Sequence, residues 1–294
     1  MSRRSPRNAF WKGHALGNDY LALDPRELDF TLSPRRVRAL CDRHRGIGAD
    51  GVLELVTSRS ADFGLRIWNP DGSRAQKSGN GLRIFARFLY ATARTRRTRL
   101  RVETPGGSVG IRLFLGADGV PRRTRVEMGV ASFDPRRLPC RLRAGDLVQR
   151  PIRAAGRLLR FTGVSIGNPH CVVFAPRGRR WSRSDLLELG PGLERHRMFP
   201  ERCNVQLATR SGPHALEILI WERGAGETSA SGTSACAVAC AAIRLGLVSS
   251  PVLARSAGGR LRVRVSEHFE VTLEGALDEV ARGTLAPDFV RALK

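Results

Sequence analysis

Long hydrophobic runs are missing from this sequence of 294 residues. The longest, Ala235 to Ile243, contains nine apolar residues, whereas a membrane span needs about 20. The basic N-terminus is followed by Asn8-Ala-Phe-Trp-Lys12 rather than by the apolar core of a signal peptide. We therefore expect a cytoplasmic protein with no membrane partner.

Lysine is scarce, although the chain is strongly basic. The formal net charge is +23, yet only three of the 50 basic residues are lysines. Clustered cations bind phosphate without regard to base sequence, but the arginine runs here are short, scattered and without aromatic neighbours. A bias toward arginine of this kind is typical of codon usage, so we expect no specific nucleic-acid partner.

Paired cysteine motifs are also absent. None of the six cysteines forms a C-x-x-C pair, and a chain of this length does not need disulfides to be stable, so neither a metal site nor a disulfide framework is predicted. Cys236 and Cys240 lie four residues apart in an alanine-rich run, the spacing of neighbours on one helical face. We expect both to be buried as small apolar side chains.

The chain repeats itself at an offset of about 150 residues. Gly17-Asn-Asp-Tyr20 matches Gly167-Asn-Pro-His170 at an offset of 150, Ser78-Gly-Asn-Gly81 matches Ser231-Gly-Thr-Ser234 at 153, and Pro105-Gly-Gly-Ser108 matches Ala257-Gly-Gly-Arg260 at 152. Three matches in one order at nearly one offset indicate two homologous halves. We place them at residues 1–130 and 131–294.

The local patterns predict an α+β fold. Ser33 followed by Pro34 is typical of a helix start, and Val37, Leu40, Cys41 and His44 then recur at helical spacing. A buried helix is expected after each Ser-Gly turn. Short apolar or alternating runs predict strands at Tyr20–Leu23, Val52–Val56, Leu65–Trp68, Val109–Leu115, Cys171–Phe174, Ala215–Trp221, Leu261–Val265 and Phe269–Leu273. Each half is therefore expected to wrap a sheet around one central helix.

The two Ser-Gly turns are candidate anion sites. The first turn of a helix carries unpaired N–H groups and the positive end of the helix dipole, and glycine lets a ligand approach the backbone. Ser78 and Ser231 taken singly could be simple N-caps. Their repetition favours an anion cradle with one hydroxyl on each side.

Several segments carry a resemblance to a known family. In chain order they are Asn8-Ala-Phe-Trp-Lys-Gly-His-Ala-Leu-Gly-Asn-Asp-Tyr20, Cys41-Asp-Arg-His-Arg-Gly-Ile-Gly-Ala-Asp-Gly51, Asn69-Pro-Asp-Gly-Ser73, Gly79-Asn-Gly81, Gly167-Asn-Pro-His170, Phe199-Pro, Asn204-Val205 and Glu222-Arg-Gly-Ala-Gly-Glu-Thr228. Between residues 8 and 280 the sequence thereby resembles diaminopimelate epimerase.

The resemblance implies a fold and an activity. The fold would be two similar halves with the active site in the cleft between them. The activity would be a 1,1-proton transfer that interconverts LL- and meso-2,6-diaminopimelate in lysine and peptidoglycan synthesis. It would use no cofactor, its partner would be a small amino-acid substrate, and a homodimer is a candidate assembly.

Family roles carry over to individual positions. The resemblance implies that His170 and Glu222 tune the acid and base. Gly79, Asn80, Gly232 and Thr233 would hold the reacting carboxylate through backbone N–H groups. The remaining substrate-binding positions are Asn18, Asn69, Asn168, Asn204, Glu222 and Arg223.

The sequence departs from the family at the two catalytic positions. The family has a cysteine before each Gly pair, one to remove the α-proton and one to deliver a proton to the opposite face, whereas this chain has Ser78 and Ser231. A free thiol has a pKa of about 8.5, and a serine hydroxyl is a far weaker acid. The chain could be an epimerase with little turnover or a silent binding homologue. It could also be an isomerase or dehydratase of other amino acids or small carboxylates, with Glu222 or His170 as base. The family pattern favours the epimerase.

Overall fold

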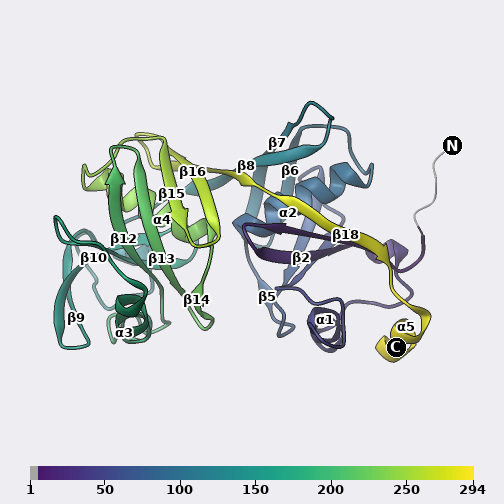
Figure 1. Cartoon of the computed structure of the whole chain (residues 1–294), viewed down its shortest axis with the longest axis horizontal. Coiled ribbons are helices and arrows are strands. Elements are labelled where there is room, and N and C mark those ends of the chain that lie inside the picture. The colour runs from purple at the N-terminus through teal and green to yellow at the C-terminus, as the bar shows by residue number, and fades with distance from the viewer. Residues whose placement is uncertain (1–5) are drawn as a thin grey trace. The chain divides into compact units, whose positions relative to one another are not determined.

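The computed structural model describes residues 6–294 and divides into two compact units. Among these residues, unit 1 contains 6–126 and Ala276–Lys294, and unit 2 contains Glu127–Gly275. The chain enters unit 2 along β8 (Pro121–Val130) and leaves it at the end of β17 (Glu270–Ala276). The colours of Figure 1 follow this path, with the C-terminal strand returning to the N-terminal elements.

Unit 1 is a sheet folded around one helix. Its strands pair in the order β18, β1, β2, β3, β4, β6, β7 and β8, with β5 attached to β4. The remaining bounds are β1 (Ala9–Ala15), β2 (Asn18–Leu23), β3 (Val52–Val56), β4 (Phe63–Trp68), β5 (Arg74–Ala75), β6 (Arg99–Thr104), β7 (Gly107–Leu115) and β18 (Asp278–Thr284), with helices η1 (Pro25–Glu27), α1 (Pro34–Cys41), α2 (Gly79–Ala91) and α5 (Pro287–Leu293).

Unit 2 follows the same plan. Its strands pair in the order β9, β10, β11, β12, β13, β15, β16 and β17, with β14 attached to β13. The bounds are β9 (Arg150–Ala154), β10 (Arg157–Ser165), β11 (Pro169–Phe174), β12 (Asn204–Gly212), β13 (Ala215–Glu222), β14 (Gly226–Thr228), β15 (Val252–Ser256) and β16 (Gly259–Val265), with helices η2 (Pro135–Arg137), α3 (Arg183–Glu194) and α4 (Gly232–Arg244).

The two units match strand for strand. Parallel pairs occur at β2–β3 and β4–β6 in unit 1, and at β11–β12 and β13–β15 in unit 2. The central helices α2 and α4 occupy the same place in the order, each buried through most of its length. The predicted α+β class, with a sheet wrapped around one helix in each half, is confirmed.

The helix after Ser33 is shorter than its apolar pattern suggests. The Ser33 hydroxyl accepts from the Arg36 N–H, and the helix ends at Cys41 because Asp42 adopts an extended conformation. His44 therefore lies outside α1 and is exposed, so its inclusion in the helical pattern was wrong. The Asp42 carboxylate instead accepts from the backbone N–H groups of His44 and Arg45, both at 2.8 Å.

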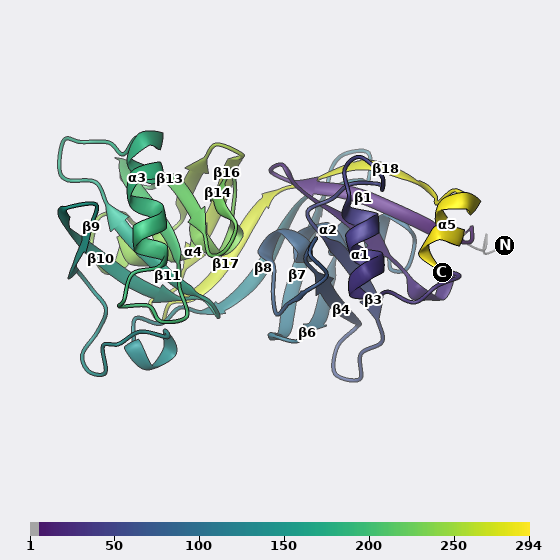
Figure 2. The same ribbon diagram turned by 90° about the horizontal axis from the view of Figure 1, so that it is seen from below.

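The C-terminal segment belongs to unit 1, which differs from the predicted half 131–294. Strand β18 pairs antiparallel with β1, Ala9 opposite Thr284. The Arg36 guanidinium donates to the Leu293 and Lys294 carbonyls at 2.5 and 3.2 Å, so α1 holds the carbonyl end of α5. Figure 2 shows both helices in unit 1. Strand β1 would otherwise be a bare sheet edge, and β18 covers it.

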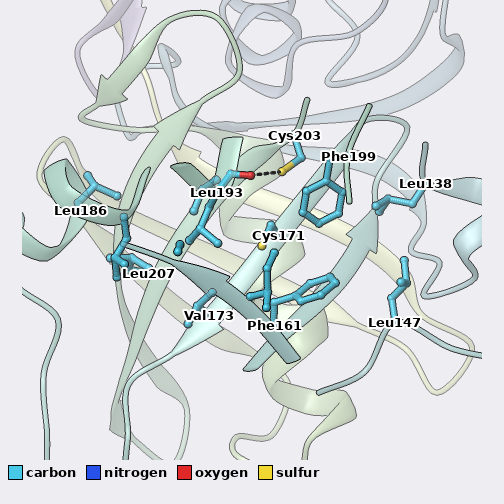
Figure 3. Packing of buried hydrophobic residues seen from close by; sticks show 14 residues of the cluster. Leu138, Leu147, Phe161, Cys171, Val173, Leu186, Leu193, Phe199, Cys203 and Leu207 are labelled. Atoms are coloured by element: carbon cyan, nitrogen blue, oxygen red, sulfur yellow. Dashed lines mark hydrogen bonds between the residues drawn. The ribbon is translucent and has the colours of Figure 1, made fainter. Parts of the chain in front are cut away.

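Each unit has its own apolar core. In unit 1, buried residues of α1 and α5 join those of β2 and β3. In unit 2, α3 packs on β11 and β12, and the rings of Phe161 and Phe199 meet edge to face at 5.5 Å (Figure 3). Cys236 and Cys240 are fully buried in α4, as predicted. Within residues 6–294, no helix has the length and apolar character needed to cross a membrane.

Truncating Leu293 tests the placement of the C-terminal helix. This side chain is 3% exposed and lies in the core of unit 1. We expect Leu293→Ala to lower the free energy of unfolding by about 2–4 kcal/mol, because a buried leucine is replaced by a cavity. Val280→Ala, at a 53% exposed position of β18, should stay within about 0.5 kcal/mol. Equal urea midpoints for Leu293→Ala and the parent would contradict this packing.

Candidate active site

The predicted residues of unit 1 gather at one edge of its sheet. Strands β2 and β3 are parallel and β4 runs against them, so the starts of β2 and β3 and the end of β4 share an edge. Asn18 begins β2 and Asn69 follows β4. The N-terminus of α2 joins them, since the Asn80 amide donates to the Asn18 Oδ1 at 3.1 Å. The Asn69 amide bonds Ser73 within its own turn at 2.9 Å.

Unit 2 places its residues in the same way. Asn168 precedes β11, Asn204 begins β12 and Glu222 ends β13. The Asn204 side chain ties these ends together: its Nδ2 donates to the Pro169 carbonyl at 3.0 Å, and its Oδ1 accepts from the Arg223 N–H at 3.1 Å.

Strand register gives the equivalent positions. Val52 lies opposite Trp68 as Val205 lies opposite Trp221, so Asn69 and Glu222 correspond. The repeat supplies the other pairs, which are Asn18 with Asn168, Tyr20 with His170, Ser78 with Ser231 and Asn80 with Thr233. The two sets therefore differ in chemistry, because unit 2 has an imidazole and a carboxylate where unit 1 has a phenol and an amide.

Both serines are helix N-caps. The Ser78 Oγ accepts from the Gly81 N–H at 3.0 Å, and the Ser231 Oγ accepts from the Ser234 N–H at 3.4 Å. The N–H groups of the first two helical residues have no partner within a helix. These are Gly79 and Asn80 in α2 and Gly232 and Thr233 in α4. Each serine thus caps one N–H and leaves an anion-binding helix end beside its hydroxyl.

Each serine hydroxyl has a second hydroxyl nearby. The Tyr20 hydroxyl lies 3.4 Å from the Ser78 Oγ, and the Thr233 Oγ1 lies 3.4 Å from the Ser231 Oγ. The Tyr20 ring occupies space left by Gly51, where a Cβ would come within 2.7 Å of the ring. Neither serine has a histidine among these contacts.

His170 is fully buried with both ring nitrogens occupied. Its Nε2 lies 2.8 Å from the Asn168 Oδ1, and its Nδ1 lies 3.0 Å from the Gln206 Nε2. The Gln206 Nε2 also donates to the Ser234 Oγ at 3.0 Å. Burial lowers the pKa of His170 to about 3, and the nearby positive charge of Arg223 also lowers it.

The tautomer of His170 follows from this chain of bonds. With Gln206 donating to Nδ1, the proton sits on Nε2 and is donated to Asn168. In the other tautomer the Gln206 amide would be flipped. Its amino group would then occupy the position of Oε1, which is buried and has no hydrogen-bond partner. Buried unsatisfied donors are costly, so the first arrangement is favoured. His170 is therefore a neutral group that orients Asn168.

A buried carboxylate holds the turn that carries Glu222 and Arg223. Glu194, 2% exposed, accepts from the Trp221 indole N–H and from the Gly224 N–H, both at 2.9 Å. The Trp221 ring lies against Gly190, where a Cβ would come within 2.8 Å of it. The Arg223 guanidinium donates to the Glu201 carbonyl at 3.2 Å and is exposed.

The cysteines offer no replacement for a catalytic thiol. Burial raises the pKa of Cys41 to about 12 and also raises that of Cys140, Cys203 and Cys240. The Cys203 Sγ donates to the Leu193 carbonyl at 3.6 Å within the apolar core (Figure 3).

Sequence reasoning missed the residues that support the predicted ones. Tyr20 could have been found from the repeat, since it matches His170. Gln206 and Glu194 carry no signal in the sequence, because a strand and a helix far along the chain bring them to the site. Within residues 6–294, no group of three or more His, Cys, Asp or Glu side chains is placed to hold a metal ion.

Comparison with known proteins gives consistent matches. A family model described as diaminopimelate epimerase matches residues 10–133 and 162–277. Diaminopimelate epimerase 2 of Nostoc sp. is 37% identical over 281 residues, which cover 95% of this chain and 96% of the relative. A diaminopimelate epimerase of Synechococcus sp. is 38% identical over 288 residues, or 96% and 99% of the two chains.

Solved structures share the fold at low identity. A hydroxyproline epimerase from Agrobacterium vitis superposes with a TM-score of 0.68 at 14% identity and covers 95% of this chain and 92% of its own. A probable proline racemase from Agrobacterium radiobacter gives a TM-score of 0.70 at 15% identity, with 95% and 93% coverage.

The buried neutral His170 predicts a pH-dependent stability. Its folded pKa, about 3, lies below the unfolded value of about 6.5, so the unfolded chain binds the extra proton. Its contribution is complete above about pH 6.5 and is lost as the pH falls, by up to about 1.4 kcal/mol per pH unit. Urea unfolding between pH 7.5 and 5 should show this slope.

A matched histidine substitution isolates the effect. His170→Gln should remove most of the slope, whereas His44→Gln, at an exposed position, should retain it. A slope that survives unchanged in His170→Gln would show that another group causes it.

Proposed function

Since the chain belongs to the diaminopimelate epimerase family, a family of lysine-biosynthesis isomerases, we propose that it binds 2,6-diaminopimelate and epimerises it at one α-carbon. The observation that carries the proposal is the recurrence, in both units, of amide and hydroxyl side chains around a serine-capped helix N-terminus. We assign both sets to ligand binding.

The helix ends suit a carboxylate. The first-turn N–H groups and the positive end of the helix dipole favour an anion, and Gly79 and Gly232 present no side chain that would block it. The exposed Arg223 suits the distal carboxylate because its guanidinium can donate two parallel hydrogen bonds. In this proposal Asn18, Asn69, Asn168 and Asn204 complete the ligand contacts.

Proton transfer would take place at the two serines. One group takes the α-proton, the electron pair left on the carbon is stabilised through the bound carboxylate, and a group opposite returns a proton to the other face. Serine has a far higher pKa than the thiol value of about 8.5, so Ser78 and Ser231 would do this slowly. We expect ligand binding to be retained and turnover to be low.

Glu222 suits an acid–base role better than His170. His170 is buried and neutral and donates to Asn168, so it has no free lone pair to take a proton. We therefore assign it an orienting role. Glu222 is half-buried at the end of β13, and its equivalent in unit 1 is the amide of Asn69.

Binding without turnover is the second candidate function. Both serine hydroxyls already accept from helix N–H groups, a role that needs no acid–base chemistry. Proton exchange separates the two functions, because only an epimerase exchanges the α-proton with solvent.

The test follows the α-proton signal of LL-diaminopimelate by NMR in deuterated water. The parent protein should exchange it slowly, and Ser78→Cys/Ser231→Cys should exchange it at least about a hundredfold faster, within the range of acid–base catalysis. Ser33→Cys/Ser182→Cys is the matched control, since it changes the caps of α1 and α3; its exchange should equal that of the parent.

Each outcome selects one function. Exchange by the parent at the rate of the cysteine variant would show that an unusual base operates. If the parent binds the ligand without exchanging its α-proton, and the cysteine variant does exchange it, the result would favour binding without turnover. Silence from both proteins would contradict diaminopimelate as the substrate.

A further inference from the structure

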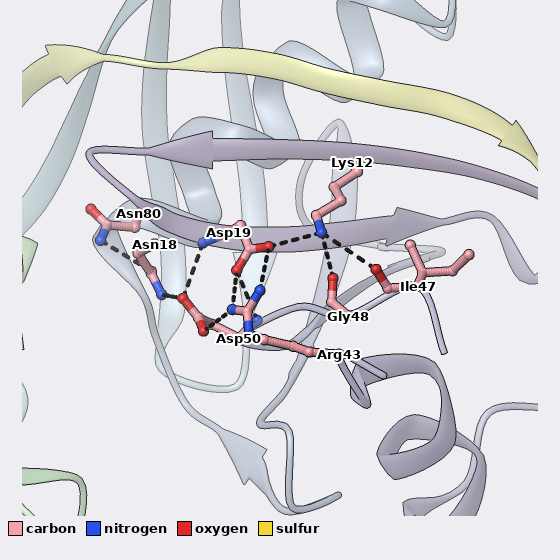
Figure 4. Close-up of polar contacts among 8 residues, drawn as sticks. All are labelled: Lys12, Asn18, Asp19, Arg43, Ile47, Gly48, Asp50 and Asn80. Carbon is pink, nitrogen blue, oxygen red and sulfur yellow. Dashed lines mark hydrogen bonds and ion pairs between the residues drawn. The ribbon is translucent and has the colours of Figure 1, made fainter. Parts of the chain in front are cut away.

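Four polar side chains of unit 1 form a chain of hydrogen bonds. The Arg83 Nη2 donates to the Asn80 Oδ1 at 2.6 Å, and the Asn80 Nδ2 donates to the Asn18 Oδ1 at 3.1 Å. The Asn18 Nδ2 then donates to the Asp50 Oδ2 at 2.8 Å. Figure 4 shows Asn80, Asn18 and Asp50 in this order. Arg83 is fully buried and Asn80 is 5% exposed.

The two ends of this chain fix its direction. A guanidinium can only donate hydrogen bonds, and an ionised carboxylate can only accept them. Asn80 must therefore turn its oxygen toward Arg83, and Asn18 must turn its nitrogen toward Asp50. An amide between two hydroxyls could flip, but these two cannot flip without placing like groups against each other.

Both ends are themselves held in place. The Arg83 Nη1 donates to the Ala276 carbonyl at 2.9 Å. The Asp50 carboxylate accepts from the Arg43 Nη2 at 2.7 Å and from the Asp19 N–H at 3.2 Å. Arg43 also pairs with Asp19, as does Lys12 at 3.0 Å (Figure 4).

Ion pairs keep the neighbouring Asp19 carboxylate charged. Burial alone would raise the pKa of Asp19, but hydrogen bonds from Arg43 and Lys12 hold it below its ordinary value. Asp19 therefore stays ionised near neutral pH and fixes the Arg43 guanidinium that clamps Asp50.

The direction of these hydrogen bonds decides which amide atoms are left for a ligand. Each amide oxygen of Asn18 and Asn80 is engaged, and each amide nitrogen keeps one hydrogen without an acceptor among residues 6–294. We propose that Arg83 and Asp50 are positioning residues that present Asn18 and Asn80 as N–H donors, so that unit 1 selects a ligand carboxylate over an ammonium. This inference rests on the proposed function for the identity of the ligand.

In unit 2 a different group orients the equivalent asparagine. The Asn168 Oδ1 accepts from the His170 Nε2, so this equivalent of Asn18 also keeps its amide nitrogen for a ligand. There a buried neutral imidazole sets the direction, instead of a charge at each end.

Two fragments of the ligand test the selectivity. Heptanedioate carries only the carboxylates of diaminopimelate, and 2,6-diaminoheptane carries only its amines. The parent protein should bind heptanedioate more tightly, as measured by ligand-detected NMR titration. In Asp50→Asn, Arg43 holds the new amide oxygen and the amide nitrogen faces Asn18. This end then opposes the direction that Arg83 still sets through Asn80, so Asn18 no longer has one fixed orientation. Heptanedioate binding should weaken about tenfold, and its preference over the diamine should fall by a similar factor.

The change in charge alone predicts the opposite effect on heptanedioate affinity. Asp50→Asn removes a negative charge near the ligand, which would tighten the binding of a dianion. Asp118→Asn is the control, since it removes an exposed carboxylate of the β7–β8 turn that pairs with Arg122; it should leave both affinities unchanged. The Asp50 side chain is 40% exposed, so its isosteric replacement should fold, which a urea midpoint verifies.

The remaining outcomes overturn the inference. They are heptanedioate binding that is unchanged or tighter in Asp50→Asn, equal weakening of both fragments, and a parent that prefers the diamine or binds neither. The proposed function fails separately: a parent that binds heptanedioate but not LL-diaminopimelate would contradict the substrate while leaving the carboxylate selectivity intact.

Discussion

A central helix begins beside the strand ends in each unit, and the site depends on this placement. The start of α2 or α4 is the positive end of a buried helix, and the adjacent loops come from parallel strands that share an edge. A serine caps one N–H of each helix and leaves two others for a ligand. The proposed anion sites therefore depend on backbone N–H groups and the helix dipole, which the sheet and the helix hold in place.

The polar side chains around these ends have little orientational freedom. In unit 1 charged groups direct the amides of Asn80 and Asn18. In unit 2 burial keeps His170 neutral, and Gln206 sets its tautomer. Two units with one fold thus orient equivalent asparagines by different chemistry. In the proposed function Ser78 and Ser231 stand at the proton-transfer positions, and the amides of Asn18 and Asn80 are proposed to contact the ligand.

The repeat, the Ser33 cap and strands such as Val52–Val56 could be predicted because each depends on local sequence. The return of Ala276–Lys294 to unit 1 could not, since it depends on the free edge of β1. From the sequence, His170 was expected to tune the acid and base or to act as a base. Its role in orienting Asn168 could not be predicted, because it follows from burial and from Gln206, which β12 brings next to it.

The most direct test of this account is a backbone NMR titration of the uniformly labelled protein with LL-diaminopimelate, following the amide signals of Gly79, Asn80, Gly232 and Thr233. The account predicts that these signals shift on titration, because the first-turn N–H groups of each helix bind a carboxylate. Signals that stay unshifted at both helices, while other residues respond to the ligand, would contradict it.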